Sequence, residues 1–134
     1  MRPDHPERLL ALAREVGASD DLVRAAVRSA PVEVPNDYLD FMRVSNGVEG
    51  TVGRAYLQLW PLETLASRNA LYEVEEFAPG LLVIGSDGGG TAYGLMQNED
   101  AVVFVEVPFI GLARDTARIR GASFAEFVEE LARS

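Results

Sequence analysis

The sequence predicts an α+β fold with N-terminal helices, a mostly antiparallel or mixed β-sheet, and a C-terminal helix packed on that sheet. In the first third of the chain, apolar residues recur every three or four positions, which is the spacing of a helix face. In the middle they alternate or form short runs bounded by Gly and Pro, as strands do. No repeat, low-complexity tract or linker interrupts the 134 residues, so a single domain over residues 1–134 is expected.

Two helices are expected before residue 31. Asp4 and Glu7 have the spacing of a capping box, and Gly17 suits the C-terminal cap of the first helix. The apolar face of this helix would consist of Leu9, Leu10, Ala13 and Val16. Ser19 can cap the second helix, which Pro31 ends. Its apolar face would consist of Leu22, Val23, Ala26 and Val27.

A third helix should begin near Pro35, because proline suits the first turn of a helix. Its inward positions, three and four residues apart, are Tyr38, Phe41, Met42 and Ser45. Asn46 and Gly47 should end it, since these two residue types tolerate the left-handed conformation of a C-terminal cap.

A strand is expected from Arg54 to Trp60, where the apolar positions alternate. One face would carry Ala55, Leu57 and Leu59, and the other Tyr56, Gln58 and Trp60. Pro61 ends the strand and can begin a helix that lasts until Pro79 and Gly80. One face of this helix would carry residues that recur at helical spacing, namely Leu62, Leu65, Asn69, Tyr72 and Glu76.

Three further strands are expected over residues 81–85, 91–96 and 101–107, with a polar turn at 97–100 between the last two. Residues 108–120 carry no clear period and are not assigned. Ser123 and Glu126 form another capping box, and they precede a C-terminal helix. The buried face of this helix should consist of Phe124, Phe127, Val128 and Leu131.

The most informative segment is the glycine-rich loop between the first two of these strands. Asp87 to Gly90 should form an exposed connection between antiparallel strands, with at least one glycine at positive φ. A phosphate-binding loop is not indicated. No Lys or Arg lies in the segment, and Gly85, Gly88 and Gly90 lack the dinucleotide-binding spacing.

The charge of the chain opposes two classes of partner and favours a third. Twelve basic and 21 acidic side chains leave a net charge of −9, which disfavours nucleic acid and anionic membranes. It favours a basic protein, because opposite charge accelerates encounter. The absence of cysteines excludes disulfides, and no apolar signal region or membrane-length run is present. A cytoplasmic protein is therefore expected.

Catalytic and metal-binding groups are sparse. His5 is the only histidine, so neither a Ser-His-Asp triad nor a His/Cys metal cluster can be built. Hydrolysis would have to use carboxylates, for which the candidates are Asp87, Glu99, Asp100 and Glu106. Solvated surface charge is the favoured interpretation of these acids, and a carboxylate-based hydrolase is the remote alternative. No cofactor and no metal is expected.

Aromatic and amide side chains supply candidate contacts to a protein partner. Tyr56 and Trp60 would anchor a partner if their strand face is open, and would be core residues if a helix covers it. Asn69 and Tyr72 share a helix face, and could either hydrogen-bond a strand edge or the glycine loop, or line a groove with Asp87. The candidate partner-binding residues are Tyr56, Trp60, Asn69, Tyr72, Asp87, Gly88, Gly89 and Tyr93.

Four segments, taken in order, resemble the SUKH superfamily, which is best known from bacterial toxin-immunity proteins and includes a fungal regulator of cell-wall synthesis. They are residues 34–47, residues 59–65 with Asn69 and Tyr72 after them, residues 82–95, and residues 123–128. The residues that carry the structural motif are Pro35, Tyr38, Phe41, Asn46, Gly47, Gly85, Gly90, Phe124 and Phe127.

This resemblance covers about residues 34–132 and leaves residues 1–33 as extra N-terminal helices. Two positions depart from the family pattern, since Thr91 stands where Asn or Asp is frequent and Met96 where Asp often follows Leu. A ligand contact that those polar groups make in relatives is therefore not carried over to Thr91 or Met96.

The resemblance implies a non-catalytic protein-binding domain, specifically an immunity-type protein that sequesters a cognate toxin in the producing cell. Many toxins paired with this superfamily are nucleases, which tend to be basic, and the net charge of −9 is compatible with such a partner. The alternative is a housekeeping interaction domain in cell-wall or signalling regulation that uses the same surface. The sequence assigns no oligomeric state.

Overall fold

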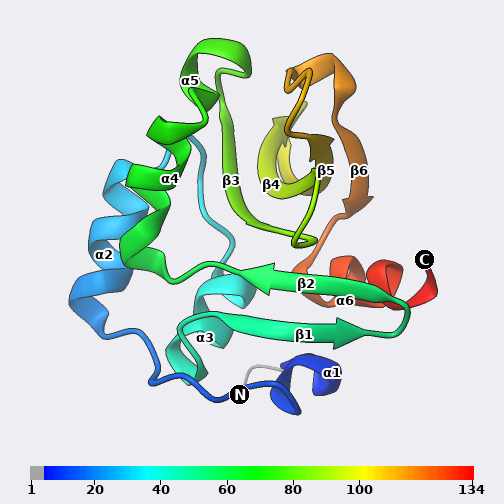
Figure 1. Ribbon diagram of the computed structural model, residues 1–134. Coiled ribbons are helices and arrows are strands. Elements are labelled where there is room, and N and C mark those ends of the chain that lie inside the picture. The colour runs from blue at the N-terminus through cyan, green and yellow to red at the C-terminus, as the bar shows by residue number, and fades with distance from the viewer. Residues whose placement is uncertain (1–4) are drawn as a thin grey trace.

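The computed structural model describes residues 5–134, and the fold is α+β (Figure 1). The helices are α1 (Glu7–Leu10), α2 (Asp20–Ser29), α3 (Asn36–Val44), α4 (Leu65–Leu71), α5 (Val74–Phe77) and α6 (Phe124–Arg133). The strands are β1 (Val48–Val52), β2 (Ala55–Leu59), β3 (Leu81–Ser86), β4 (Thr91–Asn98), β5 (Ala101–Pro108) and β6 (Arg118–Gly121). Single 3-10 turns occupy Leu62–Thr64 and Arg114–Thr116.

The strands form one sheet in the order β1-β2-β3-β4-β5-β6, and every neighbouring pair is antiparallel. The sheet curls sharply between β2 and β3, so that β3 rises steeply from the level of the β1–β2 hairpin in Figure 1. These two strands pair at Gln58↔Ser86 and Leu59↔Gly85, and the Trp60 N–H donates to the Ile84 carbonyl (2.9 Å) before the chain turns away at Pro61. Gly85 permits this junction, because a Cβ there would lie 2.1 Å from the carbonyl oxygen of Gln58.

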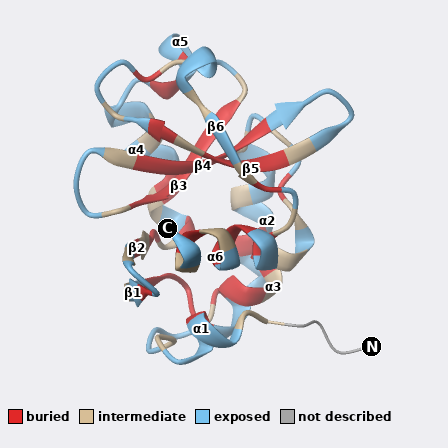
Figure 2. Ribbon diagram, turned by 90° about the vertical axis from the view of Figure 1, so that its right-hand side faces the viewer, coloured by how far each residue is buried: buried red, intermediate tan, exposed pale blue. Residues whose placement is uncertain are grey.

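Helix α6 fills the inside of the curl, and its buried residues are the predicted ones, Phe124, Phe127, Val128 and Leu131. The Phe127 ring packs on Phe104 of β5 at 5.3 Å and on Tyr93 of β4 at 5.4 Å between ring centroids. Two glycines let the sheet approach the helix backbone: a Cβ at Gly121 would lie 2.6 Å from the Phe127 nitrogen, and one at Gly53 would lie 2.2 Å from the Ala132 carbonyl oxygen. In Figure 2 the buried positions accordingly lie along the middle of the sheet and on α3 and α6.

Asp37 ties α3 to the start of α6. One of its carboxylate oxygens accepts a hydrogen bond from the Phe124 N–H (2.9 Å), and the other accepts one from the N–H of Tyr38 (2.9 Å). The Ser123 hydroxyl accepts from the N–H of Glu126, as a capping box requires. The reciprocal bond differs from the prediction, because the Glu126 carboxylate accepts from the N–H of Ala122.

The structure confirms the three strands predicted between residues 81 and 108. It also confirms the Ser19 cap of α2 and the position of α3. Pro35 is the residue immediately before α3. Gly47, at φ +106, follows its end. The polar turn predicted over residues 97–100 is shorter, because β4 extends to Asn98, and it contains Glu99 at φ +55.

The predicted first helix is wrong beyond Leu10, and Asp4 of its capping box lies outside the described residues. Val16, expected on the buried face, is 89% exposed. Gly17 serves a long-range contact in place of a helix cap, because a Cβ there would lie 1.8 Å from the Arg43 carbonyl oxygen. The neighbouring backbone bonds to the end of α3, where Ala18 N–H donates to the Met42 carbonyl (2.8 Å).

Three other elements differ from the sequence prediction. Strand β1 was not predicted, and it pairs along its whole length with β2. The helix expected over residues 62–76 is broken, since Glu73 adopts a left-handed conformation (φ +56) between α4 and α5. The unassigned stretch 108–120 contains most of β6. None of the described helices is both long enough and apolar enough to span a bilayer.

Replacing Phe127 by Ala should lower the free energy of unfolding by about 3–5 kcal/mol, because a fully buried ring would leave a cavity between β4, β5 and α6. Chemical denaturation measures the loss. The control is Glu129→Ala on the exposed side of α6, which should change stability by less than about 1 kcal/mol. Equal stability of the Phe127→Ala protein and the wild type would show that α6 is not docked.

Replacing Tyr38 by Phe should stabilise the protein by about 1 kcal/mol, because the buried Tyr38 hydroxyl has no hydrogen-bond partner among residues 5–134. Burial also raises the pKa of this phenol, so the folded state holds its proton more tightly than the unfolded state. That stabilisation is complete below about pH 10 and is lost above it. Denaturation curves at pH 8 and pH 11 should therefore diverge less for the variant than for the wild type.

Candidate functional site

The glycine-rich loop has the predicted form, a connection between antiparallel β3 and β4 with Gly88 at φ +82. Gly88, Gly89 and Gly90 are exposed, and Asp87 is half-buried. The Asp87 carboxylate accepts hydrogen bonds from the N–H groups of Gly89 (2.8 Å) and Thr91 (3.1 Å). The Asp87 N–H donates to the Thr91 carbonyl (3.0 Å). The loop is therefore held by its own aspartate, and its glycine backbone faces solvent.

A row of polar side chains lies on one side of the loop. The Tyr56 hydroxyl and the Gln58 amide both donate to the Glu49 carboxylate. The Ser86 hydroxyl donates to the Gln58 side-chain carbonyl (3.2 Å) and accepts from the Gly88 N–H (3.1 Å). This chain of bonds connects β1, β2 and β3 to the loop.

The titration of the polar row follows from these bonds. The hydrogen bonds from Tyr56 and, to a lesser extent, Gln58 lower the pKa of Glu49. Donation to Glu49 raises the pKa of Tyr56. The Tyr56 ring also closes over the loop, since a Cβ on Gly88 would lie 3.2 Å from its Cδ2.

A stack of aromatic rings lies on the other side of the loop. Tyr72 stacks on Trp60, with centroids 6.3 Å apart and planes 12° apart, and contacts Phe109 at 4.6 Å. The Arg68 guanidinium lies 4.7 Å from the Trp60 ring centre, a cation–π distance. The Phe109 N–H donates to the Gly90 carbonyl (2.9 Å), which joins the stack to the loop.

The rings of this stack differ in their solvent exposure. Trp60 is 5% exposed and is a core residue, whereas Tyr72 is 40% exposed. Leu71 and Ile110, which adjoin Tyr72 and Phe109 in the sequence, are 76% and 94% exposed. We call the polar row, the loop and the exposed part of the stack the loop face, which consists of Glu49, Tyr56, Gln58, Ser86 to Gly90, Leu71, Tyr72, Phe109 and Ile110.

Two candidate residues lie away from the loop face. Asn69 is bound to β3, since its side-chain amide donates to the Val83 carbonyl and accepts from the Val83 N–H, both at 2.9 Å. This is the strand-edge alternative considered for Asn69. Tyr93 is buried against Phe127, and desolvation, with smaller contributions from Asp87 and Glu106, raises its pKa to about 12.

The carboxylates considered for hydrolysis are dispersed. Asp87 lies at one end of the β4 strand, whereas Glu99 and Asp100 form the turn at its other end. Glu106 is paired with Arg120 in a half-buried ion pair. Within residues 5–134, no cluster of three or more His, Asp or Glu side chains has the geometry of a metal site.

Sequence reasoning missed Glu49, Phe109 and Ile110. Glu49 is on the unpredicted strand β1, and the other two follow β5 in the stretch that has no periodic pattern. The only available signal was compositional, since Phe109 and Ile110 form an apolar pair immediately after Pro108.

Comparison with known families gives one result. A family described as "SMI1 / KNR4 family (SUKH-1)" matches residues 17–130, which include the loop face and α2. The match begins earlier than the resemblance inferred from motifs, so the second N-terminal helix lies within the family domain. No curated protein matches the chain.

Replacing Gly88 by Val should destabilise the protein by at least about 1–2 kcal/mol, because a β-branched residue is strained at φ +82 and would press on Tyr56. The matched control is Gly90→Val, where a Cβ meets nothing within 4 Å and the φ is not left-handed. Thermal unfolding compares the two proteins. Equal melting temperatures for both variants would contradict this account of the loop.

Proposed function

The chain belongs to the SMI1/KNR4 (SUKH-1) family, and on that premise we propose that it is an immunity-type protein that binds and neutralises a cognate toxin. The toxin would be a basic protein such as a nuclease, and neutralisation would take place inside the producing cell. The loop face is the proposed contact surface.

The main support for the proposal is that the loop face is already ordered in the free chain, before any partner binds. Three of its parts are held by hydrogen bonds or ring contacts of the free chain: Asp87 holds the loop, Glu49 holds Tyr56, and Phe109 holds Tyr72. A surface that is ordered before binding loses less conformational entropy when a partner docks. Aromatic side chains surrounded by polar groups are also the composition of binding hot spots.

Charge would govern how fast the partner arrives. The chain carries a net charge of −9, and Glu49 contributes a carboxylate on the loop face. Long-range attraction would accelerate encounter with a basic surface, and Tyr56 and Tyr72 would then set the residence time. Inhibition would follow from occlusion of the toxin's active site, and the proposal includes no catalytic step by this chain.

The regulatory alternative uses the same loop face on a different protein, so the first test is functional. A toxin candidate encoded beside this chain is expressed in a host cell, with and without the chain. The proposal expects growth arrest with the toxin alone and growth when both are present. A neighbouring product that arrests growth equally in both cases, or that is not toxic, would refute the immunity role and favour the regulatory domain.

For the purified pair, the association rate should fall as salt rises, because salt screens the attraction between the two proteins. Glu49→Gln should lower the association rate at low salt and leave dissociation nearly unchanged, because the glutamine side-chain oxygen can still accept the hydrogen bond from Tyr56. Tyr56→Ala should instead raise the dissociation rate about tenfold or more, as loss of an anchor does. Stopped-flow or surface-based kinetics measure both rates.

The control for charge is Asp100→Asn, which removes one negative charge from the β4–β5 turn, away from the loop face. It should change the association rate less than Glu49→Gln. Asp87 is a poorer choice for this test because its carboxylate also holds the loop. An association rate that does not respond to salt would refute electrostatic steering.

A further inference from the structure

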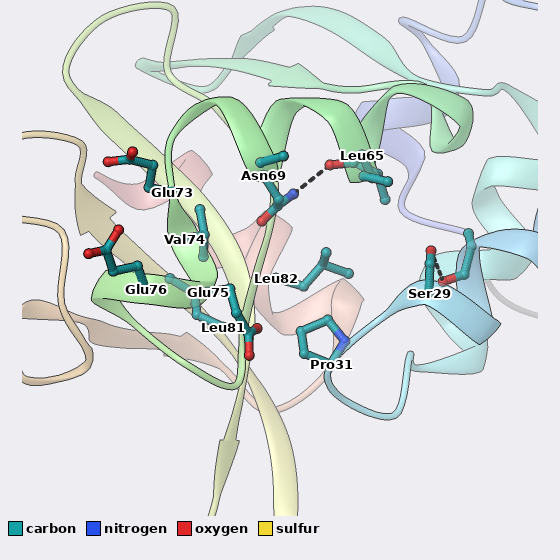
Figure 3. Close-up of a pocket in the computed structure, with 13 residues that line it drawn as sticks. Ser29, Pro31, Leu65, Asn69, Glu73, Val74, Glu75, Glu76, Leu81 and Leu82 are labelled. Carbon is teal, nitrogen blue, oxygen red and sulfur yellow. Dashed lines mark hydrogen bonds between the residues drawn. The ribbon is translucent and has the colours of Figure 1, made fainter.

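A groove lies on the opposite side of α4 from the aromatic stack, between α2, the α4–α5 segment and β3 (Figure 3). Its volume is about 490 Å³, within the range of about 300–1,000 Å³ typical of ligand sites. The floor is apolar and well packed: Leu65, Val74 and Leu82 line it and are themselves buried.

Small side chains create the space above this floor. Ala66 and Ala70 lie one helical turn apart on α4 and are exposed, and Ala26 faces them from α2. Larger residues at these positions would bring the two helices' surfaces together and close the groove. An exposed apolar channel between helices is a typical docking site for another amphipathic segment.

Carboxylates gather at one end of the groove. Glu73, Glu75 and Glu76 line its α5 end, and Figure 3 shows Glu75 closest to the floor at Leu81, with Glu73 and Glu76 directed outward. Within residues 5–134, none of these three acids takes part in an ion pair. An apolar floor with an uncompensated acidic end is complementary to a segment that is apolar on one face and basic on the other.

The hydrogen bonds along β3 indicate whether a segment bound in the groove is a strand or a helix. An extended peptide would need free N–H and C=O groups along the β3 edge in order to add a strand. Asn69 already occupies both backbone groups of Val83, and the N–H of Leu81 donates to the Ala78 carbonyl (3.0 Å). Because these three backbone groups are already paired, a strand cannot add a regular ladder here, which favours a helix that makes side-chain contacts.

We propose that this groove binds a basic amphipathic helix of a protein partner. Apolar side chains of that helix occupy the space over Leu65 and Leu82, and its Lys or Arg residues face the acids of α5. The inference goes beyond the proposed function, since the groove is separated from the loop face by α4 and requires no toxin.

The test titrates the full chain with a fluorescent synthetic helix of about 18 residues, leucine on one face and lysine on the other, at about 0.1 M salt. A leucine/glutamate helix with the same apolar pattern is the charge control. The proposal expects saturable binding of the lysine helix, with amide shift changes at Ala66, Asn69 and Ala70 in NMR spectra. Equal binding of both helices, or shift changes confined to other surfaces, would overturn it.

Two pairs of variants locate the site. Ala70→Trp fills the groove and should weaken binding about tenfold or more, whereas Ser67→Trp, an exposed α4 position outside the groove, should not. Glu75→Gln/Glu76→Gln should weaken binding several-fold, and more than Asp100→Asn/Asp115→Asn, which removes the same charge elsewhere. Equal effects within either pair would overturn the proposal.

Failure of this proposal is distinguishable from failure of the proposed function. Ala70→Trp should leave the kinetics of the loop face with a toxin unchanged, and Tyr56→Ala should leave binding of the lysine helix unchanged. Loss of helix binding in Tyr56→Ala would assign the helix to the loop face and overturn the separate groove.

Discussion

The hydrogen bonds of the Asn69 side-chain amide are the interaction on which both the loop face and the groove depend. Strand β2 leaves β3 after two paired positions, which leaves the first half of β3 at a sheet edge. Asn69 occupies both backbone groups of Val83 and bonds to the Leu65 carbonyl one turn back on its own helix (2.9 Å). It thus satisfies polar groups that would be costly to bury unpaired, and it fixes α4 against the sheet.

The position of α4 then determines what lies on either side of it. On one side, Tyr72 at its end reaches Trp60 and Phe109 and joins the glycine-rich loop through the Gly90 carbonyl. On the other side, Ala66 and Ala70 leave the groove open towards α2. Beneath both surfaces, α6 holds the curled sheet through Phe127 and through the bond between Asp37 and the start of the helix. The chain therefore presents two surfaces on one rigid support.

The sequence predicted the elements whose signal is local. The helix face of α6, the strands after Gly80, and the turn chemistry of Asp87 to Gly90 all follow from spacing and residue type. The features that the sequence did not predict depend on contacts between residues far apart in the chain. Gly17 has the composition of a helix cap, but its function is close approach to α3, which no local pattern reveals. Glu73 breaks a helix although non-glycine residues are uncommon at positive φ. Glu49 and Phe109 join the site through strand pairing and a backbone bond, respectively.

The glycine-rich loop is held by its own hydrogen bonds, so its backbone conformation does not depend on the side chains that surround it. The Asp87 carboxylate and the glycine backbone fix the course of the chain, while the side chains that project beside it come from β1, β2 and the segment after β5. Substitutions at Glu49, Tyr56 or Ile110 can therefore change the surface that a partner meets without changing the backbone that presents it. Such an arrangement lets the specificity of the surface change by single exchanges while the backbone stays the same.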